Sequence, residues 1–272
     1  MKLEEIYGKY VYIKKYNLYA YYEIAGKFLS SSAVIFIHSA GADSRQWHDT
    51  ILKLPDNHTY IVLDMIGHGK TFPLNWKAIY EKETYAEYLK EFINELGLTR
   101  YVLVGDAVGA RICLLYAVKY KPKELFGIIA FEPMDYIPGD WFGPLGTLEK
   151  ELKDSQAIAK WFISLCSDKT PHEKKSKVAW FPLSNSYNIT IGDLYSASVD
   201  LRNNLKEISC PVLLVRGKDD PLVSSQDMER IRKEIPNSSI VEIENTGHFP
   251  QVENPEVTAK IIEDFLNKIN FN

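Results

Sequence analysis

The amino-acid sequence predicts an α/β fold, in which a mostly parallel central sheet is covered by helices on both faces. Short apolar runs of strand length alternate with longer segments whose apolar residues recur at helical spacing. The alternation stops near residue 133 and resumes near residue 208, with several helical patches but no apolar strand run between them. Strands that alternate with helices indicate a parallel sheet. We therefore expect a core domain of residues 1–132 and 208–272 and a small helical insert at 133–207.

The first half of the chain predicts a hairpin followed by buried strands. Apolar and polar residues alternate over 9–13 and 18–24, with a turn at 15–17 between them. Wholly apolar runs predict four further strands, at 33–37, 60–63, 101–104 and 127–131. Helices are predicted after three of them, at 43–52, 84–96 and 109–120, with Asp43 and Thr84 as the N-caps of the first two.

The second half begins with the insert and then returns to the α/β alternation. The insert carries three aromatic pairs, Trp141-Phe142, Trp161-Phe162 and Trp180-Phe181. After it we expect a strand at 211–215, a helix at 225–235, a strand at 240–243 and a last helix at 255–269, capped by Asn254. Because the insert joins two strands of the parallel sheet, it should form a cap over their carboxyl ends.

Composition and charge exclude several classes of protein. A net charge of -4 without a basic block offers nothing that attracts a nucleic acid or an anionic membrane. No apolar run approaches the roughly 18 residues of a membrane-spanning helix, and the charged N-terminus lacks the apolar core of an export signal. The three cysteines form neither a disulfide framework nor a metal-binding pattern. We expect a cytoplasmic protein without cofactor or metal; a homodimer remains open.

The strongest chemical signal is the segment Val104-Gly105-Asp106-Ala107-Val108-Gly109, where an apolar strand turns abruptly into a helix. Glycines at 105 and 109 allow the strand and the helix to pass closely. In the G-x-S-x-G elbow, the middle residue projects above the sheet as a nucleophile, and the N–H of the next residue faces a developing oxyanion. Here the middle residue is Ala107, which has no nucleophilic group, and the next is Val108.

Three more segments follow strands at positions that fit this elbow. Ile37-His38-Ser39-Ala40-Gly41 follows an early strand, and the N–H of Ala40 is a candidate for the second oxyanion donor. Asp220, in Arg216-Gly217-Lys218-Asp219-Asp220-Pro221, and His248, in Asn245-Thr246-Gly247-His248-Phe249-Pro250, follow two late strands. The order nucleophile, Asp, His is the order of a hydrolase triad. Glu132 and Asp135 are alternative acids.

On these motifs the sequence resembles the α/β-hydrolase superfamily, and within it the capped group of esterases, C–C bond hydrolases and cofactor-free haloperoxidases. The segment Asp64-Met65-Ile66-Gly67-His68-Gly69-Lys70-Thr71 looks like the D-x-x-G-H-G-x-S/T loop of that group. The resemblance covers about residues 8–132 and 208–270. It departs from the family at His38-Ser39, where His-Gly is usual, and at Ala107, where the family has Ser.

Three interpretations of Ala107 are open. In the first, the native residue is Ser, and the sequence carries a deliberate Ser→Ala change that traps a ligand or product. In the second, the chain is a natural ligand-binding protein, as some receptor-like relatives are. In the third, another residue is the nucleophile, but the neighbouring Asp106 should point sideways rather than into the site. The otherwise intact motifs favour the first interpretation, and a natural Ser codon at 107 would exclude the second.

With Ser at 107, the resemblance implies a serine hydrolase. His248 would take the proton of the serine, Asp220 would orient His248, and the N–H groups of Ala40 and Val108 would hold the oxyanion. We expect an apolar carboxylic ester as substrate, with lactones, thioesters and C–C bonds as alternatives. The residues expected to contact the substrate are Ser39, Trp141, Trp161 and Phe249. As written, with Ala107, the chain should be inactive but still able to bind.

Overall fold

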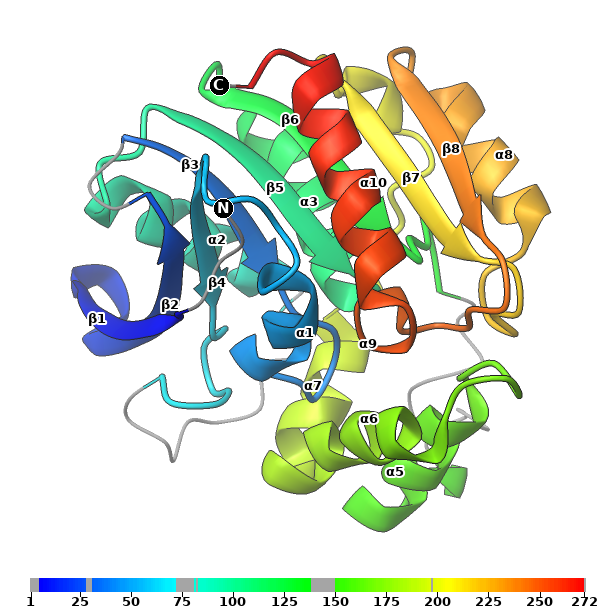
Figure 1. Cartoon of the computed structure of the whole chain (residues 1–272). Helices are drawn as coiled ribbons and strands as arrows, with labels where there is room; N and C mark the ends of the chain where they lie inside the picture. Colours follow the sequence, from blue (N-terminus) through cyan, green and yellow to red (C-terminus); the bar gives the residue numbers. More distant parts are fainter. Residues whose placement is uncertain are drawn as a thin grey trace.

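The computed structural model describes residues 5–27, 31–71, 81, 83–137, 150–196 and 198–271, which build an eight-stranded sheet flanked by helices (Figure 1). The sheet order is β1-β2-β4-β3-β5-β6-β7-β8. The strands are β1 (Tyr7–Ile13), β2 (Leu18–Gly26), β3 (Ser32–Ile37), β4 (Thr59–Leu63), β5 (Arg100–Asp106), β6 (Leu125–Phe131), β7 (Val212–Gly217) and β8 (Ser238–Ile243). Strand β2 is antiparallel to β1 and β4, and every other pair is parallel. The predicted fold class is confirmed.

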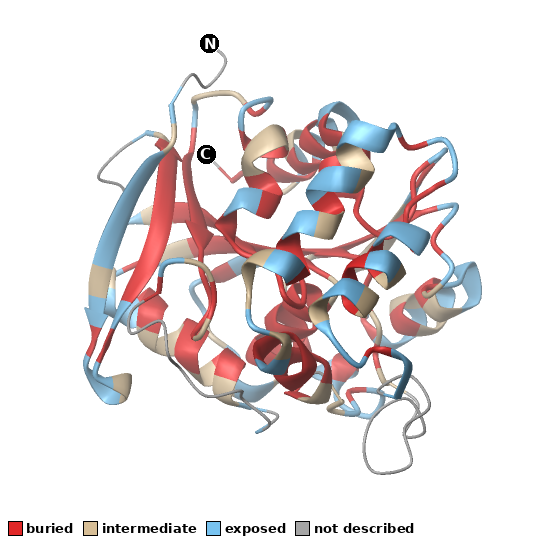
Figure 2. Cartoon of the chain, turned by 90° about the horizontal axis from the view of Figure 1, so that it is seen from below, coloured by how far each residue is buried: buried red, intermediate tan, exposed pale blue. Residues whose placement is uncertain are grey.

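Helices cover both faces of the sheet, as Figure 2 shows. Helices α2 (Thr84–Glu95), α3 (Val108–Tyr120) and α8 (Ser225–Glu234) pack on one face, and α1 (His48–Ile51) and α10 (Pro255–Lys268) pack on the other. Strand β3 shows why both faces are buried. Ala33, Ile35 and Ile37 belong to the first apolar cluster, whereas Val34 and Phe36 belong to the second, because successive side chains of a strand point to opposite faces.

The sequence predicted three N-cap residues, Asp43, Thr84 and Asn254, which can be compared with the observed starts of the helices. Asp43 accepts a hydrogen bond from the N–H of Arg45 at 3.0 Å and begins a short 3₁₀ helix, η2 (Ser44–Trp47), which leads into α1. The N-cap of α2 is Glu83, so the prediction of Thr84 as the cap is wrong. Asn254 is the N-cap residue of α10 as predicted, although its side chain makes no capping bond. The N–H of Thr84 already donates to the carbonyl of Glu81, so Thr84 lies inside the first turn of α2 rather than before it.

The described part of the predicted insert includes the helices α5 (Ser155–Ser164), α6 (His172–Ser184) and α7 (Tyr187–Ser196), which lie beyond the carboxyl ends of the parallel strands (Figure 1). Phe162 and Phe181 are buried in the insert, whereas Trp180 is 53% exposed. The pair Trp141-Phe142 lies outside the described residues. Short helices in other described segments are η1 (Lys14–Tyr16), η3 (Leu205–Glu207) and α9 (Pro250–Glu253). Within the described ranges, none of the helices has the length and apolar character needed to span a bilayer.

Candidate active site

The turn from β5 into α3 has the sharp geometry of a nucleophile elbow. Ala107, at its apex, has φ 50° and ψ −109°, a backbone conformation that residues with a Cβ rarely adopt. The two flanking glycines are required by close contact. A Cβ at Gly105 would lie 2.4 Å from the carbonyl oxygen of Gly109, and a Cβ at Gly109 would lie 2.5 Å from the carbonyl oxygen of Ile37. The sequence prediction of a tight turn at this point therefore has a direct steric basis.

Two backbone N–H groups beside this apex are free to bind an anion. Val108 is the first residue of α3, so its N–H has no acceptor within the helix. Ala40 lies in the loop after β3, and neither N–H has an acceptor anywhere in the described part of the chain. The N-terminus of α3 adds a partial positive charge near Val108. Both groups line the same cavity as Ala107.

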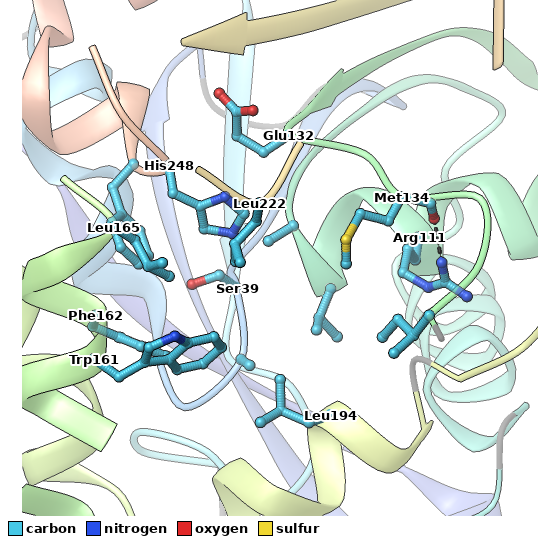
Figure 3. A pocket seen from close by; sticks show the side chains of 15 residues that line it. Ser39, Arg111, Glu132, Met134, Trp161, Phe162, Leu165, Leu194, Leu222 and His248 are labelled. Carbon is cyan, nitrogen blue, oxygen red and sulfur yellow. Dashed lines mark hydrogen bonds between the residues drawn. The ribbon is translucent and has the colours of Figure 1, made fainter. Parts of the chain in front are cut away.

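His248 and Asp220 form a buried hydrogen-bonded pair. Asp220 follows β7, His248 follows β8, and the distance from His248 Nδ1 to Asp220 Oδ2 is 2.7 Å. The other carboxylate oxygen of Asp220 accepts the N–H of Leu222 at 2.7 Å, which fixes its orientation. Burial alone would lower the pKa of His248, but the charge of Asp220 and this hydrogen bond raise the pKa above its usual value. His248 Nε2 makes no hydrogen bond within the described ranges, and the ring lines the cavity (Figure 3).

Glu132, at the end of β6, is the third acidic group of this cluster. Its backbone has a φ of 47°, and its Oε1 accepts the N–H of Gly217 at 2.5 Å. Burial and the neighbouring charge of Asp220 raise the pKa of Glu132 well above its usual value, which favours the neutral form of this carboxyl. Asp220 is the carboxylate bonded to His248, and Asp135 is occupied by Arg230 at 2.6 and 2.9 Å.

The cluster of Glu132, Asp220 and His248 has ligand atoms within 4.8 Å of one another, so we tested its geometry as a metal site. Two ligands of one tetrahedral zinc ion are separated by roughly 3.3 Å, given bonds of about 2.0–2.1 Å. His248 Nδ1 and Asp220 Oδ2 are only 2.7 Å apart. This distance is that of a hydrogen bond, and the described residues therefore fit a proton-handling pair better than a ligand set.

Asp106 lies behind the apex, bonded to two amides. Its Oδ2 accepts hydrogen bonds from Gln46 Nε2 at 3.1 Å and Gln251 Nε2 at 2.9 Å. Gln46 also makes two hydrogen bonds to Ser39, both at 2.8 Å. Its Oε1 accepts the N–H of Ser39, and its Nε2 donates to the hydroxyl of Ser39. Asp106 therefore holds Gln46 in position, and Gln46 in turn holds Ser39 at the edge of the cavity. Sequence reasoning missed both glutamines, because isolated amides carry no pattern.

The cavity between the sheet and the insert has a volume of about 50 Å³. Seven of the predicted residues line it: Ser39, Ala40, Ala107, Val108, Trp161, His248 and Phe249. Asp220 is not among the lining residues, and Trp141 lies outside the described residues. Apolar lining residues beyond the predicted substrate contacts are Ile137 and, labelled in Figure 3, Met134, Phe162, Leu165, Leu194 and Leu222. The cavity is therefore small and largely apolar.

Arg111 lies one helical turn after the apex and also lines the cavity. Its guanidinium donates to the backbone carbonyls of Met134 and Val199, and it does not pair with Asp106. Burial lowers the pKa of Arg111 to about 10. These two hydrogen bonds connect α3 to two segments of the insert, which gives Arg111 a structural role.

The sequence of this chain is similar to those of known hydrolases. Residues 34–261 match the model of the alpha/beta hydrolase family. Human monoacylglycerol lipase ABHD6 is 24% identical, with 96% of this chain and 82% of that protein covered. The 2-(acetamidomethylene)succinate hydrolase of Mesorhizobium japonicum is also 24% identical, with 88% and 89% covered.

Solved structures agree in fold. A thermophilic esterase from Thermogutta terrifontis has a TM-score of 0.80 at 25% identity, covering 97% of this chain and 99% of the esterase. A bromoperoxidase from Bacillus anthracis has a TM-score of 0.81 at 20% identity, covering 96% and 100%. Since the family model matches well over half of the residues, the chain belongs to the α/β-hydrolase family.

Proposed function

We propose that this chain, with Ser at position 107, is a serine hydrolase of apolar carboxylic esters. One observation carries the proposal: His248 is bonded through Nδ1 to Asp220 at 2.7 Å, while its ring lines the same cavity as the apex of the elbow. Because Nδ1 donates its proton to Asp220, neutral His248 is held in the tautomer whose Nε2 is unprotonated and can accept a proton from a hydroxyl. As written, with Ala107, the chain binds the ester but does not cleave it.

In the serine form, the hydroxyl oxygen attacks the acyl carbon, and its proton moves to Nε2 of His248. Asp220 stabilises the resulting imidazolium, and the N–H groups of Ala40 and Val108 bind the tetrahedral oxyanion. The ester C–O bond then breaks, and His248 returns the proton to the leaving alcohol. Water repeats both steps and releases the acid. One oxyanion donor contributes on the order of 10²–10³ in rate, and the serine on the order of 10⁶.

The substrate class follows from the lining of the cavity. Side chains such as Trp161, Phe162, Leu194 and Phe249 favour an apolar acyl group. A volume of about 50 Å³ holds little more than a few water molecules, so short acyl chains fit best while the insert keeps this position. Two of the relatives, a monoacylglycerol lipase and an esterase, carry names that support an ester as the bond.

The test is the Ala107→Ser variant beside the unchanged chain, assayed with a series of p-nitrophenyl esters and a fluorophosphonate label. We expect the serine form to hydrolyse short apolar esters and to take the label, and the alanine form to do neither. Equal rates on charged and apolar acyl groups would contradict the substrate class. A serine form that neither cleaves nor labels would contradict the proposal itself, and lactone, thioester and C–C substrates would be assayed next.

Ala107 itself favours a second candidate, a natural ligand-binding protein that keeps the pocket without the nucleophile. The two candidates differ in the natural gene. A Ser codon at 107 excludes the binding protein, whereas a natural Ala codon together with an inactive serine form excludes the enzyme. Calorimetric titration of the unchanged chain with short fatty acids and their alcohols would then define the ligand.

A further inference from the structure

One carboxylate of the insert reaches across to the loop that carries Ala40. Asp193, on α7, is 1% exposed, and three donors surround it. The N–H of Gly41 donates to Oδ2 at 2.7 Å, His68 Nε2 donates to Oδ2 at 2.9 Å, and the hydroxyl of Tyr85 donates to Oδ1 at 2.5 Å. All three donors belong to the sheet domain and none to the insert. A buried carboxylate requires such partners, so this contact holds α7 against the loop.

A second side chain of the insert holds the other side of Gly41. Asn185, at the end of α6, donates from Nδ2 to the carbonyl oxygen of Gly41 at 2.9 Å, and its Oδ1 accepts the N–H of Gly69 at 3.2 Å. Both backbone groups of Gly41 are therefore bonded to the insert. A Cβ at Gly41 would lie 2.5 Å from Thr190 Oγ1 on α7, and the φ of Gly41 is +61°, so this close approach requires glycine.

Gly41 is the third residue of a tight turn whose second residue is Ala40. The turn runs from Ser39 to Ala42 and is closed by a hydrogen bond from the N–H of Ala42 to the carbonyl of Ser39 at 3.2 Å. The sheet domain fixes the first residue, because Gln46 holds Ser39. The insert fixes the third. The direction of the free Ala40 N–H therefore depends on contacts from both sides.

We propose that Asp193 and Asn185 are positioning residues for the oxyanion loop, so that the insert contributes to rate as well as to substrate choice. The inference rests on the proposed function for its kinetic part, because Ala40 is an oxyanion donor only in the serine hydrolase. Its structural part, that these two side chains order the Ser39–Ala42 turn, is independent of any reaction. When the insert moves away from the sheet, Gly41 loses both partners and the oxyanion hole loses its shape.

The structural part is tested in the chain as it stands, with Ala107, by NMR hydrogen exchange of the Ala42 amide. The N–H of Ala42 closes the turn by donating to Ser39, and Asp193 does not bond to it. Asn185 contacts this residue and its neighbour only through carbonyl oxygens, that of Gly41 at 2.9 Å and that of Ala42 at 3.4 Å. We expect Asp193→Ala and Asn185→Ala each to accelerate its exchange about tenfold or more. Two controls lie in the insert away from the loop: Asp200→Ala removes an exposed ion pair with Arg202, and Ile158→Val loosens a buried position of α5.

The kinetic part is tested by the same four changes combined with Ala107→Ser, using p-nitrophenyl butyrate. Loss of a whole oxyanion donor lowers kcat by on the order of 10²–10³. Because Gln46 still holds the first residue of the turn, we expect a smaller fall of kcat, about 10- to 100-fold, for Asp193→Ala and Asn185→Ala. KM should stay within about threefold, since the acyl pocket is untouched, and both controls should keep kcat within about twofold.

The two measurements separate the possible failures. If Ala107→Ser shows no esterase activity, the proposed function fails, and the exchange of Ala42 decides the structural part alone. Unchanged exchange in the folded variants overturns the inference. So does an equal fall of kcat in Ile158→Val, because general loosening of the insert would then explain the effect. Should Asp193→Ala not fold, Asn185→Ala carries the test, since its side chain is only partly buried.

Discussion

Replacing Ala107 by Gly should make the protein more stable, although glycine usually destabilises a folded chain. Ala107 has φ 50° and ψ −109°. Residues with a Cβ that are held in such sparsely populated regions cost on the order of 1–3 kcal/mol each, because the Cβ crowds the neighbouring backbone. Glycine adopts positive φ readily and releases that strain.

Two opposing effects reduce the gain. Glycine increases the conformational entropy of the unfolded chain, which lowers stability by about 0.4–1 kcal/mol. Removing the methyl group also loses a little apolar burial, which is small because Ala107 is only half-buried. The net expectation is a stabilisation of about 1 kcal/mol, or a rise in Tm of roughly 2–4 °C for a chain of this size.

Urea unfolding of Ala107→Gly against the parent measures this difference, with Ala117→Gly as the matched control. Ala117 lies inside the same helix, α3, is buried, and has no positive φ. The control should lose about 1–2 kcal/mol through helix propensity and a lost buried methyl group. Opposite signs at the two positions are the signature of strain at the apex. A loss of stability at 107 comparable to that at 117 would refute the reasoning.

Three further predictions concern charge and pocket shape. Burial raises the pKa of Asp106 to about 7, so the folded chain keeps a proton that the unfolded chain releases near pH 4. The stability that this group contributes is therefore lost as pH rises from about 4 to about 7, and Asp106→Asn should remove that loss when urea unfolding is compared at pH 5 and pH 8. In the serine form, kcat/KM should rise with pH through a pKa above 6.5, because Asp220 raises the pKa of His248 and only neutral His248 accepts the proton. Asp220→Asn should move this limb to lower pH and lower kcat by on the order of 10⁴, and an unmoved limb would assign the limb to another group. Trp161→Ala should enlarge the cavity and shift the p-nitrophenyl ester profile toward longer acyl chains, whereas an unchanged profile would place the acyl group elsewhere.

Local patterns were sufficient to predict the strands and the elbow. Apolar runs such as 33–37 and 101–104 coincide with buried strands of the observed sheet, because a parallel sheet covered on both faces admits few polar side chains. The elbow was predictable from two glycines four residues apart, which the close approach of α3 to β5 and to the end of β3 makes necessary. These features depend on residues that are close together in the sequence, so the spacing of residue types is enough to predict them.

Contacts between distant segments were not predictable in the same way. Gln46 and Gln251 meet on one oxygen of Asp106, and Asp193 meets Gly41 from a helix of the insert. Each of these is a single polar residue in an ordinary stretch of sequence. Only the three-dimensional arrangement shows that it is buried and which group it bonds. The motifs indicated the candidate site residues, but the sequence did not indicate the side chains that hold these residues in place.

The strain at position 107 bears on which interpretation of Ala107 is preferable. A positive φ at the apex has a use when the side chain must project into the cavity toward His248, as a serine hydroxyl would. A methyl group forms no hydrogen bond there, so alanine keeps the strained backbone conformation but supplies no nucleophile. A binding protein free of the reaction would lose nothing by replacing the apex residue with glycine and would gain stability. The strained alanine, beside an intact pair of His248 and Asp220, therefore favours a serine as the residue that this backbone was selected to hold.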